Sequence, residues 1–220
     1  MIKRYLALRF FMTMIKNIVF DMGGVLVDLS RERSVRQFKA LGVSDASDLI
    51  NPYSHNGLFG SLENGDITTL EFCRLLSDHC GKELHPDAIR EAWKSMVNPA
   101  PVYKLDYILE LRKQYKCYVL SNNNDMIVEW AKTSDFSEAR RPISDYFDRM
   151  YFSYELKCMK PHPEIFRKMI ADSGIIPSDS LYIDDGIQHL ETARSLGFVT
   201  LLAENGKDWR ADVDRCLKQL

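Results

Sequence analysis

Apolar and polar positions divide the chain into short apolar runs and longer amphipathic stretches. Five runs are rich in β-branched and aromatic residues and have the length of buried strands: 17–21, 117–123, 149–155, 180–185 and 198–204. Between the later runs, apolar positions recur at helical spacing, at 101–115, 163–174 and 187–197. Continuous apolar strands that alternate with amphipathic helices are typical of a parallel sheet covered on both faces. We therefore predict an α/β fold with a doubly wound, Rossmann-like parallel sheet.

The segment that follows the first strand departs from this alternation. Residues 31–97 carry several helical patterns, separated by a turn-rich stretch at 51–66, and none of their runs has the pattern of a strand. A helical block inserted directly after a strand can close over the strand ends as a lid. We predict a core domain formed by 14–30 and 98–220, an inserted helical cap domain at 31–97, and an N-terminal extension at 1–13.

Composition and charge exclude several classes of protein. The formal net charge is −2 over 220 residues, with acids and bases mixed along the chain, so we expect no nucleic-acid or membrane partner. The five cysteines are scattered without a C-x-x-C pair, which indicates neither a disulfide framework nor a zinc site. The basic, apolar stretch at 1–13 is broken by Arg9 and lacks a small-residue cleavage site, and no later run reaches the ~18 apolar residues of a spanning helix. We expect a cytoplasmic protein, monomeric or weakly dimeric, that acts on small molecules.

Polar residues at the predicted strand ends form the candidate site. They follow the first, second and fourth strands or precede the helix at 163–174, and they are Asp21, Ser121, Asn122, Lys160, Asp184 and Asp185. Each alone is compatible with a helix cap, a turn or a surface position. Together they are more specific, because ligands collect at the carboxyl ends of the strands in open parallel sheets.

These residue types suit the chemistry of a phosphoryl group. Asp21, Asp184 and Asp185 would repel one another unless a divalent cation lay among them, and oxygen ligands of this kind favour Mg²⁺. Lys160 adds a positive charge. A cation and a lysine would hold a dianionic phosphoryl group beside Asp21, with the Ser121 hydroxyl and backbone amides on the remaining oxygens.

The order and spacing of these residues resemble the haloacid dehalogenase-like hydrolase superfamily, from Met14 to about Glu204. Its motif D-x-D-G-T/V corresponds to residues 21–25, and its later motifs correspond to Ser121, to Lys160 in a KPxPxIF context and to the acidic pair. The stretch LENGDITTLEF at 62–72 resembles the helical cap of one subgroup. Within that subgroup the chain is similar to α-D-glucose-1-phosphate phosphatase-like sugar phosphatases, which also carry glycine at the position of Gly23.

This resemblance implies a role for each residue. Asp21 would attack phosphorus and form an aspartyl phosphate, which splits one difficult displacement into two easier ones. Ser121, Asn122 and Lys160 would bind the phosphate. The metal ligands would be Asp21, the backbone carbonyl of Gly23 and Asp185, with Asp184 as a ligand or as a support through water. The implied function is Mg²⁺-dependent hydrolysis of a small phosphomonoester.

Gly23 is the departure from the family pattern, because family phosphatases carry an acid–base aspartate at this position. Such acid–base help is worth ~10²- to 10⁴-fold in rate. Three alternatives stay open. The cap supplies the acid, with His55, Glu63 and Asp66 as candidates; the substrate is a sugar phosphate, such as a sugar 1-phosphate, whose leaving group needs little acid; or the protein binds a phosphorylated metabolite with weak or no turnover. We favour a sugar phosphatase.

Overall fold

A parallel five-stranded sheet forms the centre of the part that the computed structural model describes, residues 14–50 and 57–219. Its strand order is β3-β2-β1-β4-β5, and all neighbouring strands are parallel. The strands are β1 (Asn17–Phe20), β2 (Lys116–Ser121), β3 (Arg149–Phe152), β4 (Ser180–Asp184) and β5 (Val199–Leu202). Strand β1 lies in the centre, and the later strands are added outward on both sides of it, so the predicted doubly wound α/β fold is confirmed.

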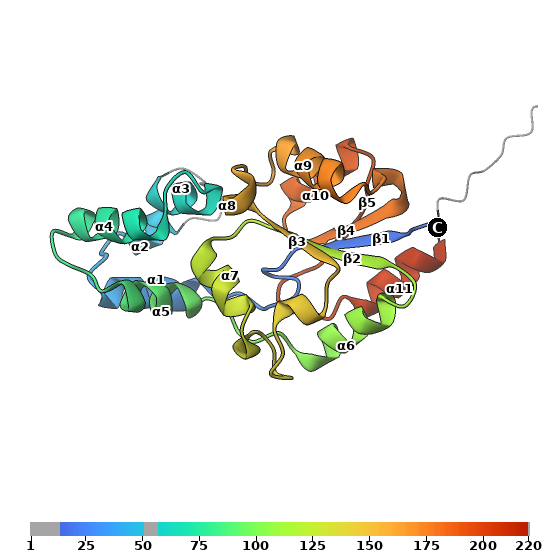
Figure 1. Ribbon diagram of the computed structural model, residues 1–220. Coiled ribbons are helices and arrows are strands. Elements are labelled where there is room, and N and C mark those ends of the chain that lie inside the picture. The colour runs from blue at the N-terminus through green and yellow to red at the C-terminus, as the bar shows by residue number, and fades with distance from the viewer. Residues whose placement is uncertain (1–13, 51–56, 220) are drawn as a thin grey trace, which may run out of the picture.

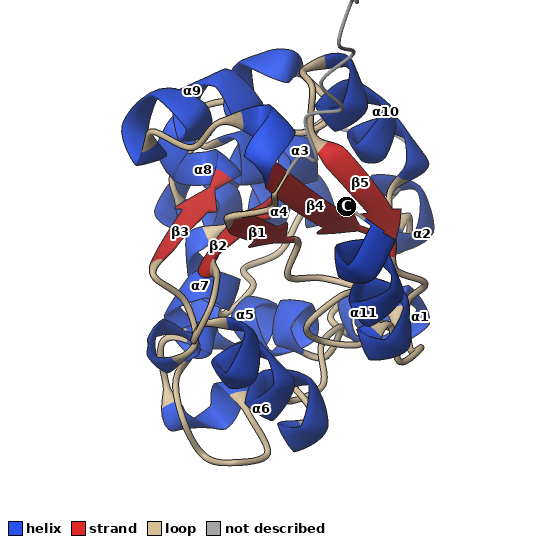
Figure 2. Ribbon diagram, turned by 90° about the vertical axis from the view of Figure 1, so that its right-hand side faces the viewer, coloured by secondary structure: helices blue, strands red, loops and turns tan. Residues whose placement is uncertain are grey.

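Helices cover both faces of the sheet (Figure 2). On one face, Val19 of β1 packs in a cluster with α9 (Pro163–Ser173) and α10 (Ile187–Ser195). On the other face, Ile18 and Phe20 pack in a cluster that includes α6 (Val102–Leu111) and α11 (Arg210–Gln219). Successive side chains of a strand point to opposite faces, and both faces are buried, which explains why the strands are continuous apolar runs.

The shorter elements of the core lie in the connections that follow the strands. They are α7 (Asp125–Ala131), α8 (Ser153–Leu156) and the 3₁₀ turns at Ser134–Phe136, Ile143–Asp145 and Pro177–Asp179. The predicted third strand at 149–155 ends earlier than expected, at Phe152, and its last residues belong to α8.

The segment at 31–97 forms a helical layer beyond the carboxyl ends of the strands, on the left of Figure 1. Its helices are α1 (Arg31–Ala40), α2 (Ala46–Leu49), α3 (Leu58–Asn64), α4 (Thr69–Cys80) and α5 (Pro86–Lys94). An aromatic cluster of Phe38, Phe59, Phe72 and Trp93 holds this layer together, with ring centroids 4.8 to 6.1 Å apart. Edge-to-face packing adds to the burial of these rings.

Helix α3 lies within the stretch at 51–66 that the sequence pattern assigns to turns, and this assignment is wrong for 58–64. Glycines at 57, 60 and 65 hide the helix in the sequence, since glycine disfavours helices. Tertiary packing overrides that propensity, because Phe59 and Leu62 are buried in the helical layer. Gly65 then ends the helix in the left-handed conformation.

Two linkers join the helical layer to the core and run antiparallel to each other. Leu29 pairs with Val97 across them, and the Ser30 N–H donates to the Met96 carbonyl at 2.8 Å. The predicted N-terminal extension at 1–13 lies outside the described residues. Within them, all five cysteines are free thiols, and no helix has both the length and the apolar character needed to cross a membrane.

Candidate active site

Asp21 lies at the carboxyl end of β1, in the middle of the sheet. Its backbone N–H donates to the Ile183 carbonyl of β4 at 2.8 Å, so the strand ladder itself fixes the start of the following loop. The side chain is buried, and its Oδ1 accepts from the Met22 N–H at 2.7 Å. Burial raises the pKa of Asp21, while Lys160 opposes that rise.

Lys160 joins two of the carboxylates that the sequence singles out. Its Nζ lies 2.9 Å from Asp21 Oδ1 and 2.7 Å from Asp184 Oδ2, and it donates to the Leu120 carbonyl at 3.1 Å. The residue is fully buried. Although burial alone would lower the pKa of Lys160, the two aspartates raise it, so the ammonium stays charged.

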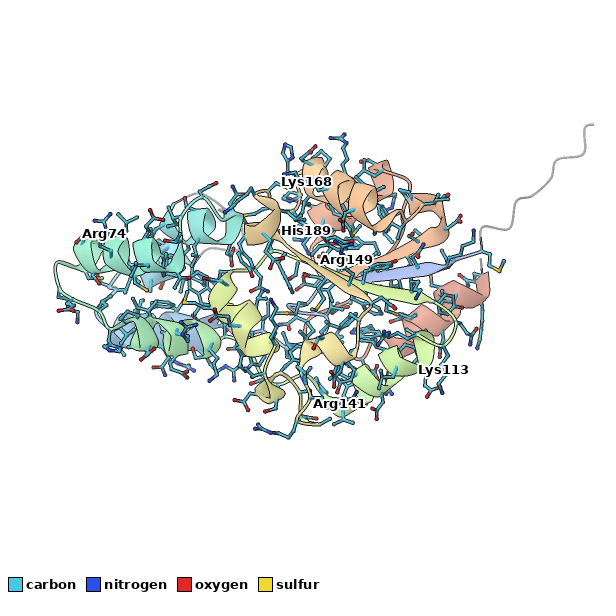
Figure 3. All side chains as sticks on the ribbon, in the orientation of Figure 1. Arg74, Lys113, Arg141, Arg149, Lys168 and His189 are labelled. Atoms are coloured by element: carbon cyan, nitrogen blue, oxygen red, sulfur yellow. The ribbon has the colours of Figure 1, made fainter. Side chains whose placement is uncertain are left out.

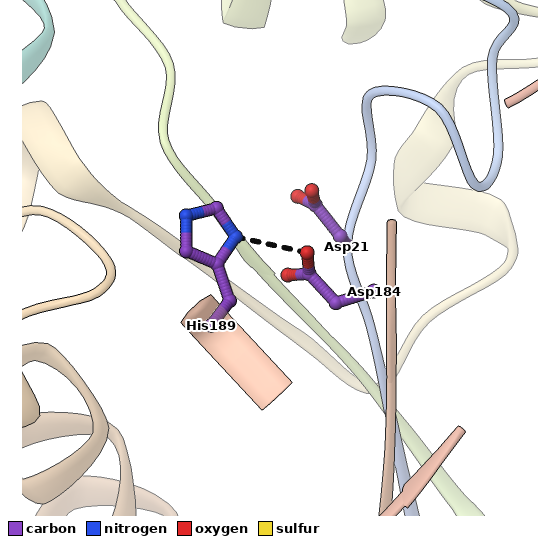
Figure 4. A group of neighbouring side chains, drawn as sticks. All are labelled: Asp21, Asp184 and His189. Carbon is purple, nitrogen blue, oxygen red and sulfur yellow. Dashed lines mark hydrogen bonds and ion pairs between the residues drawn. The ribbon is translucent and has the colours of Figure 1, made fainter. Parts of the chain in front are cut away.

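Asp184 is surrounded by donors on every side. Its Oδ1 accepts from the Gly186 N–H at 2.7 Å and lies 2.9 Å from His189 Nδ1 (Figure 4). Its Oδ2 accepts from Lys160 and from the Tyr182 hydroxyl. A carboxylate offers about four lone-pair directions, and these four partners use them. Although burial alone would raise the pKa of Asp184, Lys160 and His189 hold it well below its usual range.

Asp185 carries the charge that Lys160 does not neutralise. Burial, followed by repulsion from Asp21 and Asp184, raises the pKa of Asp185 to about 7. Gly24 lies directly against it: an added Cβ at Gly24 would clash with Asp185 Oδ2, and the φ of +75° also favours glycine. This close approach brings the backbone of the loop after Asp21 to the Asp185 carboxylate.

A divalent cation fits this arrangement on grounds of charge and donor type. Three carboxylates face one ammonium, and the site keeps excess negative charge that a cation would balance. Asp21, Asp184 and His189 each place one donor atom within 4.8 Å of the others. Because Asp184 is already saturated by its donors, Asp21 and Asp185 have more capacity left for a metal. Hard oxygen donors of this kind suit Mg²⁺.

The residues after β2 serve two different tasks. Ser121 is buried, and among the described residues no hydrogen bond occupies its hydroxyl. Asn122 instead binds the peptide of Lys160 on both sides: its Nδ2 donates to the Lys160 carbonyl and its Oδ1 accepts from the Lys160 N–H, both at 2.8 Å. The Asn122 side chain therefore positions Lys160, and the contact of Asn122 with phosphate stays a prediction.

His189 and Tyr182 belong to the site, and the analysis of the sequence missed both. His189 lies in the first turn of α10, on the side of the sheet that α9 and α10 cover (Figure 3). Tyr182 is fully buried on β4, two residues before Asp184, so both point to the same face of the sheet. That two-residue spacing was a usable signal for Tyr182. A lone histidine after an acidic pair carries no comparable signal.

Two of the three proton-donor candidates at 31–97 lie within the described residues. Asp66 is exposed and accepts from Asn64 at 2.8 Å, and His55 lies outside the described residues. Glu63 is partly exposed on α3, and burial raises its pKa to about 7. Its backbone carbonyl accepts from Ser153 Oγ at 2.6 Å, which ties α3 to the core beside the end of β3.

Comparisons with known proteins place the chain in a family. The model of the haloacid dehalogenase-like hydrolases matches residues 15–197. The chain therefore belongs to the haloacid dehalogenase-like hydrolase family, and the predicted family and hydrolase class are confirmed.

One curated relative is similar over nearly the whole chain. D-ribitol-5-phosphate phosphatase of Bacteroides thetaiotaomicron is 46% identical over 200 residues, which cover 91% of this chain and 97% of the relative. This similarity supports a phosphate-monoester hydrolase and agrees with the sugar-phosphatase resemblance of the sequence.

Solved structures agree with this placement. A predicted HAD-like family hydrolase from Porphyromonas gingivalis superposes with a TM-score of 0.90 at 40% identity, over 94% of this chain and 100% of the other. A HAD family enzyme from B. thetaiotaomicron, in complex with magnesium and inorganic phosphate, has a TM-score of 0.82 at 38% identity, over 89% and 97%. The solved B. thetaiotaomicron neighbour thus binds magnesium, in agreement with the Mg²⁺ predicted for this chain.

Proposed function

We propose that this protein is a Mg²⁺-dependent phosphatase that hydrolyses a small sugar or polyol phosphate through an aspartyl-phosphate intermediate on Asp21. The observation that carries this proposal is the fully buried Lys160, which lies within 3 Å of both Asp21 and Asp184. A buried ion pair with a second carboxylate is a poor device for stability alone, because desolvation opposes it. It is well suited to hold a dianion beside a nucleophile.

The residues act in two half-reactions. In the first, an Asp21 oxygen forms a bond to phosphorus while the bond from phosphorus to the alcohol oxygen breaks, and the departing oxygen takes up a proton. In the second, water attacks phosphorus and gives up one proton to solvent, while the bond from phosphorus to the Asp21 oxygen breaks; hydrogen phosphate leaves and the Asp21 carboxylate is restored. Lys160 offsets the charge on the phosphoryl oxygens throughout, and the free Ser121 hydroxyl binds one of them.

The metal would be held by Asp21 and Asp185, with the Gly23 carbonyl as a third ligand. Asp184 would support it from outside, since its oxygens are occupied by Lys160 and neighbouring donors. When bound, Mg²⁺ supplies charge stabilisation to the phosphoryl group. We also propose that α1 to α5 form the cap domain, because they lie over the carboxyl ends of the strands where the site is found (Figure 1).

The substrate class is supported by the relative and narrowed by chemistry. D-ribitol-5-phosphate phosphatase is named for an open-chain polyol phosphate, and the ester oxygen of a 5-phosphate leaves as a primary alkoxide. Such a leaving group needs a proton more than the anomeric oxygen of a sugar 1-phosphate does. Hydrolysis of a polyol 5-phosphate would therefore need a proton donor other than residue 23 for the leaving alkoxide, whereas hydrolysis of a sugar 1-phosphate would not require one.

A substrate panel tests the proposal. Phosphate release is measured with Mg²⁺ from ribitol 5-phosphate, a hexose 1-phosphate, a hexose 6-phosphate and p-nitrophenyl phosphate, for the native protein and for Asp21→Asn. The proposal expects turnover of at least one sugar or polyol phosphate, and loss of that turnover in the variant. Binding of phosphate without Asp21-dependent release from any substrate would replace the enzyme with a metabolite-binding protein.

A further inference from the structure

Gly23 and Leu29 meet at the edge of the site. Gly23 lies two residues after Asp21 and is partly exposed, as is Leu29. An added Cβ at Gly23 would stand 3.0 Å from Leu29 Cδ1 and 3.6 Å from its Cγ and Cδ2. A contact of 3.0 Å is shorter than the 3.5 to 4.0 Å at which carbon atoms attract. Leu29 therefore crowds the space that a side chain at position 23 would take, and it would have to shift by a few tenths of an ångström to admit one.

A side chain at position 23 is disfavoured by this contact and not by the backbone conformation of Gly23. Gly24, the next residue, has a φ of +75°, which disfavours other residues, whereas Gly23 is not among the glycines with positive φ. The three heavy atoms nearest to the added Cβ at Gly23, among the described residues, all belong to the Leu29 side chain. The backbone conformation at Gly23 thus accepts other residues, and the Leu29 side chain is the neighbour that hinders them.

Leu29 is held in this place by the core. The Asn205 side chain binds both backbone groups of Leu29: its Oδ1 accepts from the Leu29 N–H at 2.9 Å, and its Nδ2 donates to the Leu29 carbonyl at 3.0 Å. Fully buried Lys104 donates to the Val25 carbonyl at 3.0 Å and lies 3.1 Å from Asp28 Oδ1. The backbone that carries Leu29 is therefore anchored on both sides, so the loop holds the Leu29 side chain next to position 23.

From this geometry we infer that Leu29 is a specificity-determining residue, which occupies the side-chain space of position 23 and keeps ionisable groups away from that side of Asp21. The inference rests on the proposed phosphatase function. Gly23 and Leu29 then act as a matched pair: the apolar Leu29 side chain lies where a carboxyl group at position 23 would otherwise reach the leaving oxygen. The enzyme then favours esters whose leaving oxygen needs no proton from this side.

A stability cycle tests the pair without any reference to activity. Thermal unfolding is measured for Gly23→Ala, Leu29→Ala and the double variant. Overpacking predicts that Gly23→Ala lowers Tm by about 3 °C or more beside Leu29, and by less than half as much once Leu29 is shortened. An equal loss in the two backgrounds would overturn the inference, whatever the protein does to phosphate esters.

A kinetic cycle tests the consequence for the reaction. Gly23→Asp is made alone, with Leu29→Ala, and with Leu29→Ile, which keeps the space filled as a matched control. Two variants, Gly23→Asp and Gly23→Asp/Leu29→Ile, should lose activity in the presence of Mg²⁺. Their kcat/KM should fall about tenfold or more for both ribitol 5-phosphate and p-nitrophenyl phosphate. With Leu29→Ala, turnover of the aryl ester should recover. The preference for the aryl over the alkyl ester should also fall about tenfold, because a carboxylic acid can now protonate the alkyl leaving group.

The pH profile separates this effect from a merely structural one. The Gly23→Asp/Leu29→Ala variant should acquire a new alkaline decline on ribitol 5-phosphate, absent from Leu29→Ala alone. The same decline in Gly23→Asp without Leu29→Ala would overturn the inference. If no variant and no native protein released phosphate, the proposed function would fail, while the stability cycle would still decide the part played by Leu29.

Discussion

Replacing Asp185 by asparagine should stabilise the magnesium-free protein at alkaline pH. The native site holds three carboxylates against the single ammonium of Lys160, and Asp185 bears the surplus charge. Asparagine keeps the shape of the side chain and removes its charge. Active sites often sacrifice stability in this way for function, and the structure identifies the group responsible.

The size of the effect follows from the pKa of Asp185. It is about 7 in the folded protein and 3.8 ordinarily. Between these values the folded state binds the proton more tightly than the unfolded state does, so stability falls as pH rises from about 4 to about 7. The full difference corresponds to about 4 kcal/mol at alkaline pH. Because Asp185 is partly exposed, we expect solvent screening to reduce this to about 2 to 3 kcal/mol.

Urea unfolding at pH 5 and pH 8 in EDTA measures this effect. Asp185→Asn should be about 2 to 3 kcal/mol more stable than the native protein at pH 8, and the difference should shrink at pH 5. Added Mg²⁺ should stabilise only the native protein. Exposed Glu83→Gln is the control and should leave the pH dependence unchanged. A variant less stable than the native protein at pH 8, or a difference independent of pH, would refute the reasoning.

Three further changes test other parts of the site. Lys160→Met should destabilise the protein by about 3 to 5 kcal/mol at pH 7 in urea unfolding, since it leaves buried carboxylates unpaired; an unchanged midpoint would contradict the buried pair. Gly24→Ala should weaken Mg²⁺ binding about tenfold or more by calorimetry, because its Cβ meets Asp185. Gly81→Ala is the control, since Gly81 has a φ of +63° and an added Cβ there meets no described atom within 4 Å. The control should add only backbone strain of about 1 to 2 kcal/mol and leave Mg²⁺ binding intact. Ser153→Ala removes a hydroxyl that bonds a carbonyl of α3 at 2.6 Å and should cost about 1 to 2 kcal/mol, with faster hydrogen exchange in α3; unchanged exchange would show that this bond does not dock the helix.

The sheet and the central residues of the site were predictable because they depend on a simple geometric rule. Parallel strands end at one edge, so Asp21 and Asp184, which lie 163 positions apart, come together once the strands are recognised. The apolar runs identified those strands because both faces of the sheet are buried. The positive charge of Lys160 was then expected beside these two carboxylates.

Other parts of the site depend on contacts that leave no local pattern. The Asn122 amide binds the peptide of Lys160, 38 positions away, and nothing in either segment indicates which oxygen the amide will meet. His189 acquires its role only from the path of α10 past Asp184. Helix α3 forms through burial of Phe59 against Phe72 of α4, although its glycines predict a turn.

Trapping the covalent intermediate tests the central claim most directly. A single turnover of labelled ribitol 5-phosphate with Mg²⁺ is quenched in acid at early times, and the digested protein is examined by mass spectrometry for phosphate on each peptide. The account predicts transient phosphate on the peptide that contains Asp21, formed and lost at rates that match release of phosphate, and none in Asp21→Asn. Turnover without phosphate on that peptide at any time, or label retained by Asp21→Asn, would contradict a nucleophilic role for Asp21.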